Sequence, residues 1–386
     1  MKTFFKKWLK RFTIGLVLLS AALAMFVAFT PQGKTAFHTA LFVAQVLEFP
    51  VKPQSWFTVD PLREVVTYPR PNGEGVADVY RLPDGKPRAT VLLFLGANAA
   101  GRDDEDVVTL GNALARAGVV TMFHWSPTMA LQYNIDPNEI ENLVWAFDYL
   151  QGQSFVDPDR VGVGGFCIGA SFALIAASDP RIREDVAFIN AFGPYYDARD
   201  LLLQVATRSR YYQDNVEPWI PDRLTQKVFV NELVEAMEAP DDQAMLVRVF
   251  VDNVQASQQE LDLLSVQGMA AYKLLSGVES MEEAERLYLM LPAEFRGMMS
   301  IVSPRSHVAD LRAQVLILHD RNDDLVPSAE SRRLSDQLKE SGSNVRYTEL
   351  LNFEHVRPTS GGGIKDFITE GYKLFRHMYS ILRIAR

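Results

Sequence analysis

A cysteine flanked by glycines restricts the possible folds of this chain more than any other feature. Residues 165–169, Gly-Phe-Cys-Ile-Gly, follow an apolar run typical of a buried strand and precede a run typical of a helix. A strand that turns directly into a helix leaves little room at the turn, and glycine neighbours provide that room. The pattern predicts a strand, a sharp turn and a helix, with the nucleophile position of the turn occupied by Cys167.

Cys167 is the only cysteine among the 386 residues, so a disulfide within the chain is excluded. A thiol at the first turn of a helix is placed where the helix dipole and the free amides favour the thiolate. We therefore expect Cys167 to be a nucleophile. The alternative is a buried structural cysteine between two glycines.

Three further segments predict the remaining groups of an acyl-transfer site. The apolar strand expected at 89–95 ends in a loop that begins Gly96-Ala97, where such enzymes place oxyanion donors. A second apolar strand at 314–319 leads into the acidic loop 320–327, and a strand at 345–350 precedes His355. Nucleophile, acid and histidine thus follow one another in the order of a known catalytic triad.

Residues 156–169 resemble the nucleophile region of the α/β-hydrolase superfamily, in particular its dienelactone-hydrolase-like branch, which uses cysteine. The resemblance covers roughly residues 60–200 and 305–386. It implies a mostly parallel sheet flanked by helices. Two features differ from that branch: the loop at 96–98 has no glutamate, and a large insertion interrupts the core.

The same resemblance assigns the site residues. The triad is Cys167, Asp323 and His355, the oxyanion donors are the amides of Ala97 and Ile168, and the glycines of the turn are Gly165 and Gly169. Asp320 and Asp324 are alternatives to Asp323 as the acid, because all three lie in one loop.

The N-terminus predicts a membrane anchor. Residues 1–11 carry five cations and no acid, and residues 12–29 are uncharged and mostly apolar, which is long enough to span a bilayer. Because a basic flank stays in the cytoplasm, a single-pass anchor would place the body on the other side, periplasmic or extracellular. The alternative is a signal peptide that is cleaved, leaving a secreted protein.

The rest of the chain divides into three parts. Residues 30–60 are expected to form an interfacial or body-packed helix and a linker. Residues 61–196 and 311–386 form the core, in which strands alternate with helices. Residues 197–310 lack this alternation and predict a helical cap, with helices at 224–237, 241–262 and 280–291. We expect the cap to set the size of the substrate, with Trp219 and Tyr272 among its aromatic residues; the alternative is a lobe that only packs on the core.

Charge and motifs exclude several classes of partner. The net charge is −9 and the basic residues of the N-terminus stand apart from an acidic body, which argues against nucleic acid. The sequence has no metal-ligand spacing, dinucleotide fingerprint or phosphate-binding loop, so we expect no metal and no cofactor. Nothing in the sequence indicates an oligomeric state.

Three functions fit these observations. The first is a membrane-anchored hydrolase of esters, lactones or thioesters that forms a covalent acyl-enzyme on Cys167. The second is an acyltransferase with the same nucleophile, because polyester synthases share the Gly-x-Cys-x-Gly pattern. The third is a hydrolase-fold protein without catalysis, which binds a lipid or a partner at the membrane.

Overall fold

The computed structural model describes residues 2–47, 52–97, 101–351, 353–354, 357–358 and 364–385. Within these residues the core is one eight-stranded sheet with the strand order β1-β2-β4-β3-β5-β6-β9-β10. Its strands are β1 (Leu62–Arg70), β2 (Gly73–Arg81), β3 (Arg88–Phe94), β4 (Val120–Trp125), β5 (Val156–Phe166), β6 (Val186–Phe192), β9 (Gln314–Asp320) and β10 (Val345–Leu350). Strand β2 pairs antiparallel with both neighbours, and from β4 to β10 each neighbouring pair is parallel.

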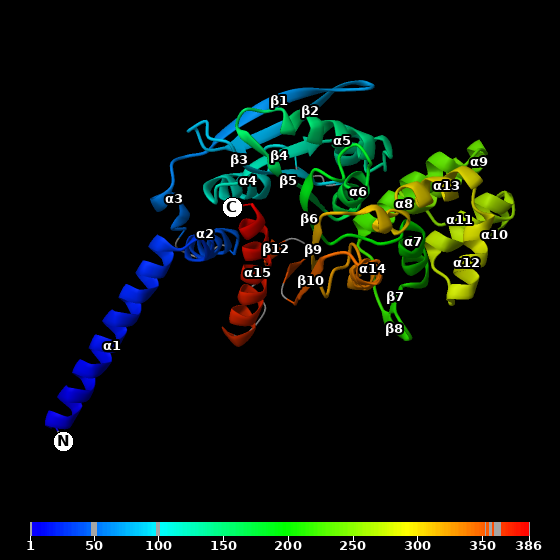
Figure 1. Ribbon diagram of the computed structural model, residues 1–386. Coiled ribbons are helices and arrows are strands. Elements are labelled where there is room, and N and C mark those ends of the chain that lie inside the picture. Colours follow the sequence, from blue (N-terminus) through cyan, green and yellow to red (C-terminus); the bar gives the residue numbers. More distant parts are fainter. Residues whose placement is uncertain are drawn as a thin grey trace.

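Helices cover both faces of the sheet, as Figure 1 shows. One face packs against α5 (Asn138–Gln151), α6 (Ile168–Ala176) and α14 (Ser328–Glu340), and the other against α4 (Glu105–Arg116) and α15 (Ile364–Ile384). Side chains of β3 alternate between the two cores, because successive residues of a strand point to opposite faces. Leu92 and Phe94 belong to one core, and Val91 and Leu93 to the other. The alternation of strands and helices expected from the sequence is therefore present.

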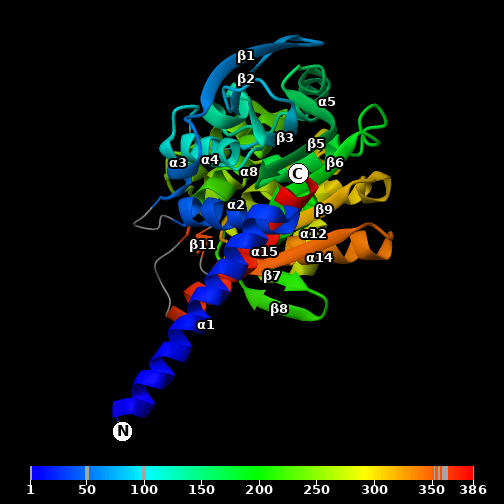
Figure 2. The same cartoon turned by 60° about the vertical axis from the view of Figure 1, so that its left-hand side comes forward.

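The N-terminal helix α1 (Lys2–Phe29) projects away from the body in both views (Figures 1 and 2). Its stretch Arg11–Phe29 is long and apolar enough to cross a membrane, and the body buries none of it. Helix α2 (Pro31–Val46) follows after the single residue Thr30, which caps it. Helix α2 packs on α15 and α4 through buried residues such as Phe42, so it is fixed to the body. The short helix α3 (Gln54–Phe57) lies in the segment expected to be a linker.

A long insertion separates β6 from β9. It contains a two-stranded hairpin, β7 (Ser209–Tyr212) and β8 (Asn215–Pro218), and seven helices within the described residues. The helices are α7 (Ala198–Thr207), α8 (Arg223–Ala236), α9 (Pro240–Phe250), α10 (Gln258–Leu261), α11 (Val266–Ser276), α12 (Met281–Met290) and α13 (Ala293–Ile301). The helix expected over 241–262 is wrong as one element, because α9 ends at Phe250 and α10 begins only at Gln258, and Asn253 between them has a φ of 56°.

Several short elements complete the fold, among them two 3-10 helices at Pro304–Ser306 and Val308–Asp310. Residues 128–132 form one π-helical turn after β4, and it ends at Tyr133, whose φ is 59°. The two-residue strands β11 (Phe353–Glu354) and β12 (Arg357–Pro358) pair with each other between β10 and α15. The carboxyl ends of the parallel strands β3, β5, β6 and β9 lie at one edge of the sheet, and the predicted site residues Ala97, Cys167 and Asp323 follow β3, β5 and β9.

Candidate active site

Cys167 occupies the turn between β5 and α6 in a backbone conformation that is rare for a residue with a side chain. Its φ is 54° and its ψ is −128°, and its amide donates to the carbonyl of Phe192 on the neighbouring strand, at 2.8 Å. Such a conformation costs on the order of 1–3 kcal/mol and persists where the surrounding structure imposes it. The side chain is half-buried. The sharp strand-to-helix turn predicted from the sequence is thus present at Cys167.

The two glycines of the turn are required by the close approach of the backbone. A Cβ on Gly165 would lie 2.5 Å from the carbonyl carbon of Gly169 and 2.5 Å from the carbonyl oxygen of Phe94. A Cβ on Gly169 would lie 2.2 Å from that same oxygen of Phe94. Real Cβ atoms do not approach backbone this closely, so only glycine fits at either position. Strand β3, which ends at Phe94, is therefore held directly against the turn.

The loop after β3 lies against the first turn of α6. Gly96 has a φ of 68°, and a Cβ there would lie 2.5 Å from Cγ2 of Ile168. Ile168 is the first residue of α6, so its amide has no acceptor within the helix. The segments that carry the predicted oxyanion donors, Ala97 and Ile168, are therefore neighbours. Residues 98–100, the rest of this loop, lie outside the described residues.

The acidic loop follows β9 on the other side of β6. Asp323 is buried, and its Oδ1 accepts the amides of Leu325 and Val326 at 2.8 and 2.9 Å. Asp320 is also buried and accepts the amide of Asn322 at 3.1 Å, whereas the side chain of Asp324 is exposed. Two of the three candidate acids are thus inside the protein; two amides of the loop bind the carboxylate of Asp323, and one binds that of Asp320.

Two histidines at the ends of strands are fully buried. His319, on β9, has Nε2 at 3.6 Å from Oδ2 of Asp323 and at 2.8 Å from the carbonyl of Val326, while its Nδ1 is 2.6 Å from the hydroxyl of Ser331. His124, on β4, lies between the hydroxyl of Tyr68 and the carboxylate of Glu139, at 2.7 Å from each. Both rings are therefore held by hydrogen bonds on both nitrogens. The predicted base, His355, lies outside the described residues.

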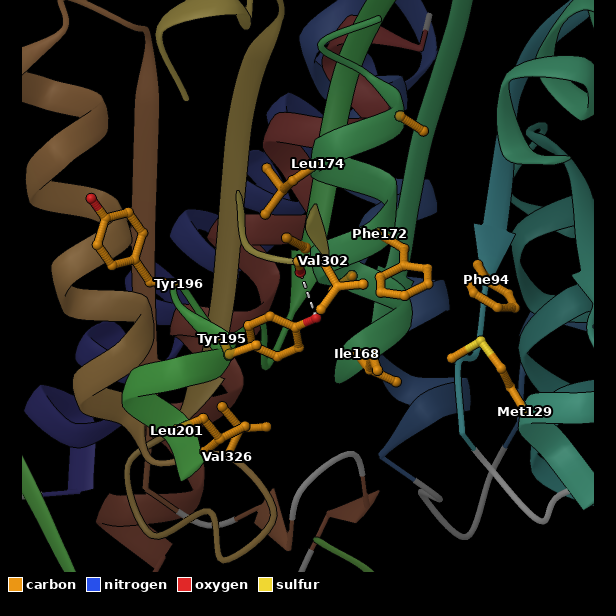
Figure 3. Close-up of a cluster of buried hydrophobic side chains, with 14 of the residues drawn as sticks. Phe94, Met129, Ile168, Phe172, Leu174, Tyr195, Tyr196, Leu201, Val302 and Val326 are labelled. Carbon is orange, nitrogen blue, oxygen red and sulfur yellow. Dashed lines mark hydrogen bonds between the residues drawn. The ribbon is translucent and has the colours of Figure 1, made fainter. Parts of the chain in front are cut away.

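The loop after β6 and the end of α13 pack beside the cysteine turn, as Figure 3 shows. The hydroxyl of Tyr195 donates to the carbonyl of Val302 at 2.7 Å, and the backbone of Tyr195 bonds the hydroxyl of Ser171 on α6. Burial raises the pKa of the Tyr195 phenol well above its ordinary value, and the nearby Cys167 contributes to the same shift. Tyr195 therefore stays neutral and remains a hydrogen-bond donor. No sequence pattern marks it, because its partner carbonyl is distant in the chain.

A buried carboxylate fixes the same loop from the side of α14. Glu330 is completely buried and accepts the amides of Tyr196 and Asp197 at 2.9 and 3.1 Å. It also pairs with Arg333, which in turn pairs with Asp200 of α7. Burial raises the pKa of Glu330, and Arg333 opposes this shift. This network ties the first helix of the insertion to the helix that follows the acidic loop.

No family model matches the sequence. A curated relative, a probable 2-oxo-3-(5-oxofuran-2-ylidene)propanoate lactonase of Bradyrhizobium sp, is 29% identical over 98 residues, which span 23% of this chain and 39% of that protein.

Solved structures cover more of the chain. A protein of Bacteroides ovatus described as a dipeptidyl aminopeptidase IV matches 83% of this chain and 36% of its own, with 12% identity and a TM-score of 0.50. An esterase of Pyrobaculum calidifontis matches 95% of this chain and 97% of its own, with 16% identity and a TM-score of 0.47. The chain has the α/β-hydrolase fold. This follows from the strand order with a single reversed strand, from the helices on both faces of the sheet and from the strained turn after β5.

Proposed function

We propose that the protein is a hydrolase of carboxylic esters or lactones, in which Cys167 forms a covalent acyl-enzyme. The observation that carries this proposal is the conformation of Cys167, a nucleophilic residue at positive φ between two glycines that the backbone packing requires. A turn of this kind presents its side chain at the carboxyl edge of the sheet. The name of the lactonase relative supports a lactone or ester as the substrate class.

The proposed mechanism uses His355 as the base and Asp323 as its partner. His355 takes the proton of the Cys167 thiol, the sulfur attacks the carbonyl carbon, and the same proton passes to the leaving alkoxide. Water then attacks the thioester carbonyl while His355 accepts its proton, the C–S bond breaks to release the acid, and the proton passes from His355 to the sulfur of Cys167. The amides of Ala97 and Ile168 bind the oxyanion, and each such donor contributes roughly 3 kcal/mol to the transition state.

The insertion and the N-terminal helix complete the proposal. Residues 197–310 act as a cap on the site, supported by the contact between Val302 and Tyr195 beside the cysteine turn. Helix α1 anchors the protein in a membrane, supported by its exposed apolar stretch Arg11–Phe29. With the basic residues 1–11 in the cytoplasm, the catalytic body lies on the opposite side.

Mass spectrometry of Cys167 tests the proposal. Purified protein is mixed with phenyl acetate, a γ-lactone and an acyl thioester, quenched in acid and digested. We expect an acyl adduct on the peptide that contains Cys167, and none in Cys167→Ala. Folded protein that releases product from these substrates without any adduct, and with equal rates in Cys167→Ala, would refute a cysteine nucleophile.

The fate of the acyl group separates hydrolysis from transfer. With an added alcohol or amine, a hydrolase releases mostly free acid, whereas an acyltransferase releases the new ester or amide. A folded protein that neither turns over these substrates nor becomes labelled would favour a binding protein with the hydrolase fold.

A further inference from the structure

The backbone of the acidic loop is bound by the insertion along most of its length. Four of the five backbone carbonyls of residues 321–325 accept a hydrogen bond from the insertion. They are the carbonyls of residues 321, 323, 324 and 325. The donors are Arg210 Nη1 at 2.8 Å, Trp219 Nε1 at 2.9 Å, the amide of Asp222 at 2.7 Å and Thr225 Oγ1 at 2.8 Å. We call these four donors the clasp.

Trp219 is the central member of the clasp. Its indole is 5% exposed, and Nε1–H donates to the carbonyl of Asp323 itself. The amide of Trp219 donates in turn to the carbonyl of Arg208, at 2.9 Å, which fixes the backbone that carries the ring. The residue follows β8 directly and precedes α8, so the hairpin and the helix hold it from both sides. An indole has one hydrogen-bond donor, its Nε1–H, and in the buried Trp219 this donor is paired with the carbonyl of Asp323.

The opposite side of the loop is held by the core. His319 Nε2 lies 2.8 Å from the carbonyl of Val326, and the carboxylate of Asp323 closes a tight turn on the amides of Leu325 and Val326. Because Oδ1 of Asp323 is bound to its own loop, the direction of the second oxygen depends on the backbone conformation of residues 323–326. The clasp and His319 fix that conformation between them.

We propose that Trp219 is a positioning residue that sets the orientation of the Asp323 carboxylate through its backbone carbonyl. This inference rests on the proposed function, in which Asp323 stabilises the charged form of the base. It gives the insertion a part in the chemistry, in addition to any effect on substrate size. An orienting carboxylate acts when the base takes the proton, so its displacement lowers kcat rather than substrate binding.

The test uses a substitution that removes the donor and keeps a ring. In Trp219→Phe the hydrogen bond to the carbonyl of Asp323 is lost. The matched control is Trp145→Phe, because the indole of Trp145 donates to Glu141 on α5, at 2.8 Å, outside the site. A second pair at Thr225 serves if Trp219→Phe does not fold: Thr225→Val removes the hydroxyl that reaches Leu325, and Thr225→Ser retains it.

Two measurements are made on the full-length proteins. Hydrogen exchange followed by mass spectrometry reports the amides of Leu325 and Val326, which bond the Asp323 carboxylate. We expect exchange about tenfold faster in Trp219→Phe and Thr225→Val, and unchanged in the two controls. With p-nitrophenyl acetate we expect kcat to fall about 10- to 100-fold in Trp219→Phe with KM nearly constant.

The outcomes separate this inference from the proposed function. Unchanged exchange in both Trp219→Phe and Thr225→Val would overturn the clasp, whatever the activity. Faster exchange with unchanged kcat, or a rise in KM alone, would overturn the positioning role. A wild-type protein that never forms an adduct on Cys167 would refute the proposed function, while the exchange data would still decide whether the clasp holds the loop.

Discussion

Gly96 packs so closely against Ile168 that a methyl group on the Cα of Gly96 would push the two residues apart. A Cβ on Gly96 would lie 2.5 Å from Cγ2 of Ile168 and 2.6 Å from the amide nitrogen of Gly169, which belongs to the backbone of α6. The loop after β3 and the first turn of α6 are therefore in direct contact. If their amides bind one oxyanion, the distance between them decides how well they do so.

Gly96→Ala should damage the site more than the fold. The positive φ of Gly96 costs about 1 kcal/mol for alanine, and the contact with α6 forces the two segments apart. We expect acylation of Cys167 to slow by at least about 100-fold, the loss typical of an oxyanion donor. Gly85→Ala is the control, because Gly85 has a similar φ of 65° and open space around its Cβ. Equal acylation rates in the two variants would contradict the proposed oxyanion site.

The backbone strain at Cys167 predicts an inverted order of stability. In most positions glycine is less stable than alanine by about 0.5–1 kcal/mol. At a φ of 54° and a ψ of −128° a side chain is disfavoured, so Cys167→Gly should be more stable than Cys167→Ala by about 1 kcal/mol. Urea unfolding of both variants measures this difference. An alanine variant that is the more stable of the two would show that the turn is relaxed.

The same pair of variants tests the nucleophile. Both should lose nearly all turnover, leaving a residual of ~10³-fold over water from the oxyanion donors and binding. Cys167→Ser should also lose most activity, because a hydroxyl proton is harder to remove than that of a thiol. Ester hydrolysis assays on the folded proteins provide the comparison, and wild-type rates in Cys167→Ala would end the nucleophile assignment.

Glu232 predicts a pH-dependent stability of the insertion. It lies on α8, is buried, and accepts the amide of Ile135 in the loop before α5. Burial raises its pKa to about 7, and the nearby carboxylates of Glu235 and Asp136 add to the shift. The folded protein therefore binds this proton more tightly than the unfolded chain, so the stabilisation is complete at acid pH and is lost as the pH rises through about 7.

Glu232→Gln should remove this dependence, because glutamine keeps an acceptor for Ile135 and carries no charge. Relative to wild type, the variant should gain about 2 kcal/mol of unfolding free energy between pH 5 and pH 8. Denaturant unfolding at the two pH values measures the change. Glu238→Gln, at an exposed carboxylate just after α8, should show no such gain. If the difference in unfolding free energy between Glu232→Gln and wild type is the same at both pH values, the ionised carboxylate of Glu232 is solvated in the folded protein.

The N-terminal helix predicts the location of the body. With residues 1–11 on the cytoplasmic side, protease added to spheroplasts should digest the catalytic body without lysis. Deletion of residues 2–29 should release the protein from the membrane fraction and leave acylation of Cys167 intact, because the body buries none of the apolar stretch. Protection of the body until lysis would reverse the orientation, and release of the intact chain into the medium after processing would indicate a signal peptide.

Local sequence patterns predicted the elements of the core and the turn at Cys167. The apolar side chains of residues 138–151 recur at helical spacing, which predicts a helix there, and α5 spans Asn138–Gln151. Gly165 and Gly169 were recognisable from the sequence, because a sharp turn at a nucleophile leaves no room for a Cβ on either side of it. Such features depend on residues close together in the chain.

Features that depend on distant contacts were not predictable. The hairpin β7–β8 packs on α14, and four residues of each strand give too short a pattern to recognise. The clasp is formed with backbone carbonyls about 100 residues away, and a carbonyl leaves no trace in a sequence. Trp219, expected to shape a pocket, was therefore recognisable as an aromatic residue but not as a donor to Asp323. The structure describes both Asp323 and Cys167. His355 lies outside the described residues, so its role as the base remains a prediction.

The packing of α2 on α15 has a consequence for the synthesis of the protein. These two helices lie side by side in both views, although one begins at residue 31 and the other ends at residue 384 (Figures 1 and 2). The ribosome makes α2 before the strands of the sheet and α15 after them. The buried side chains of α2, such as Phe42, therefore have no partner on α15 until the whole sheet has been made. The nascent chain must keep this surface of α2 from other contacts while the sheet is being made, so the synthesis of α15 closes this part of the fold.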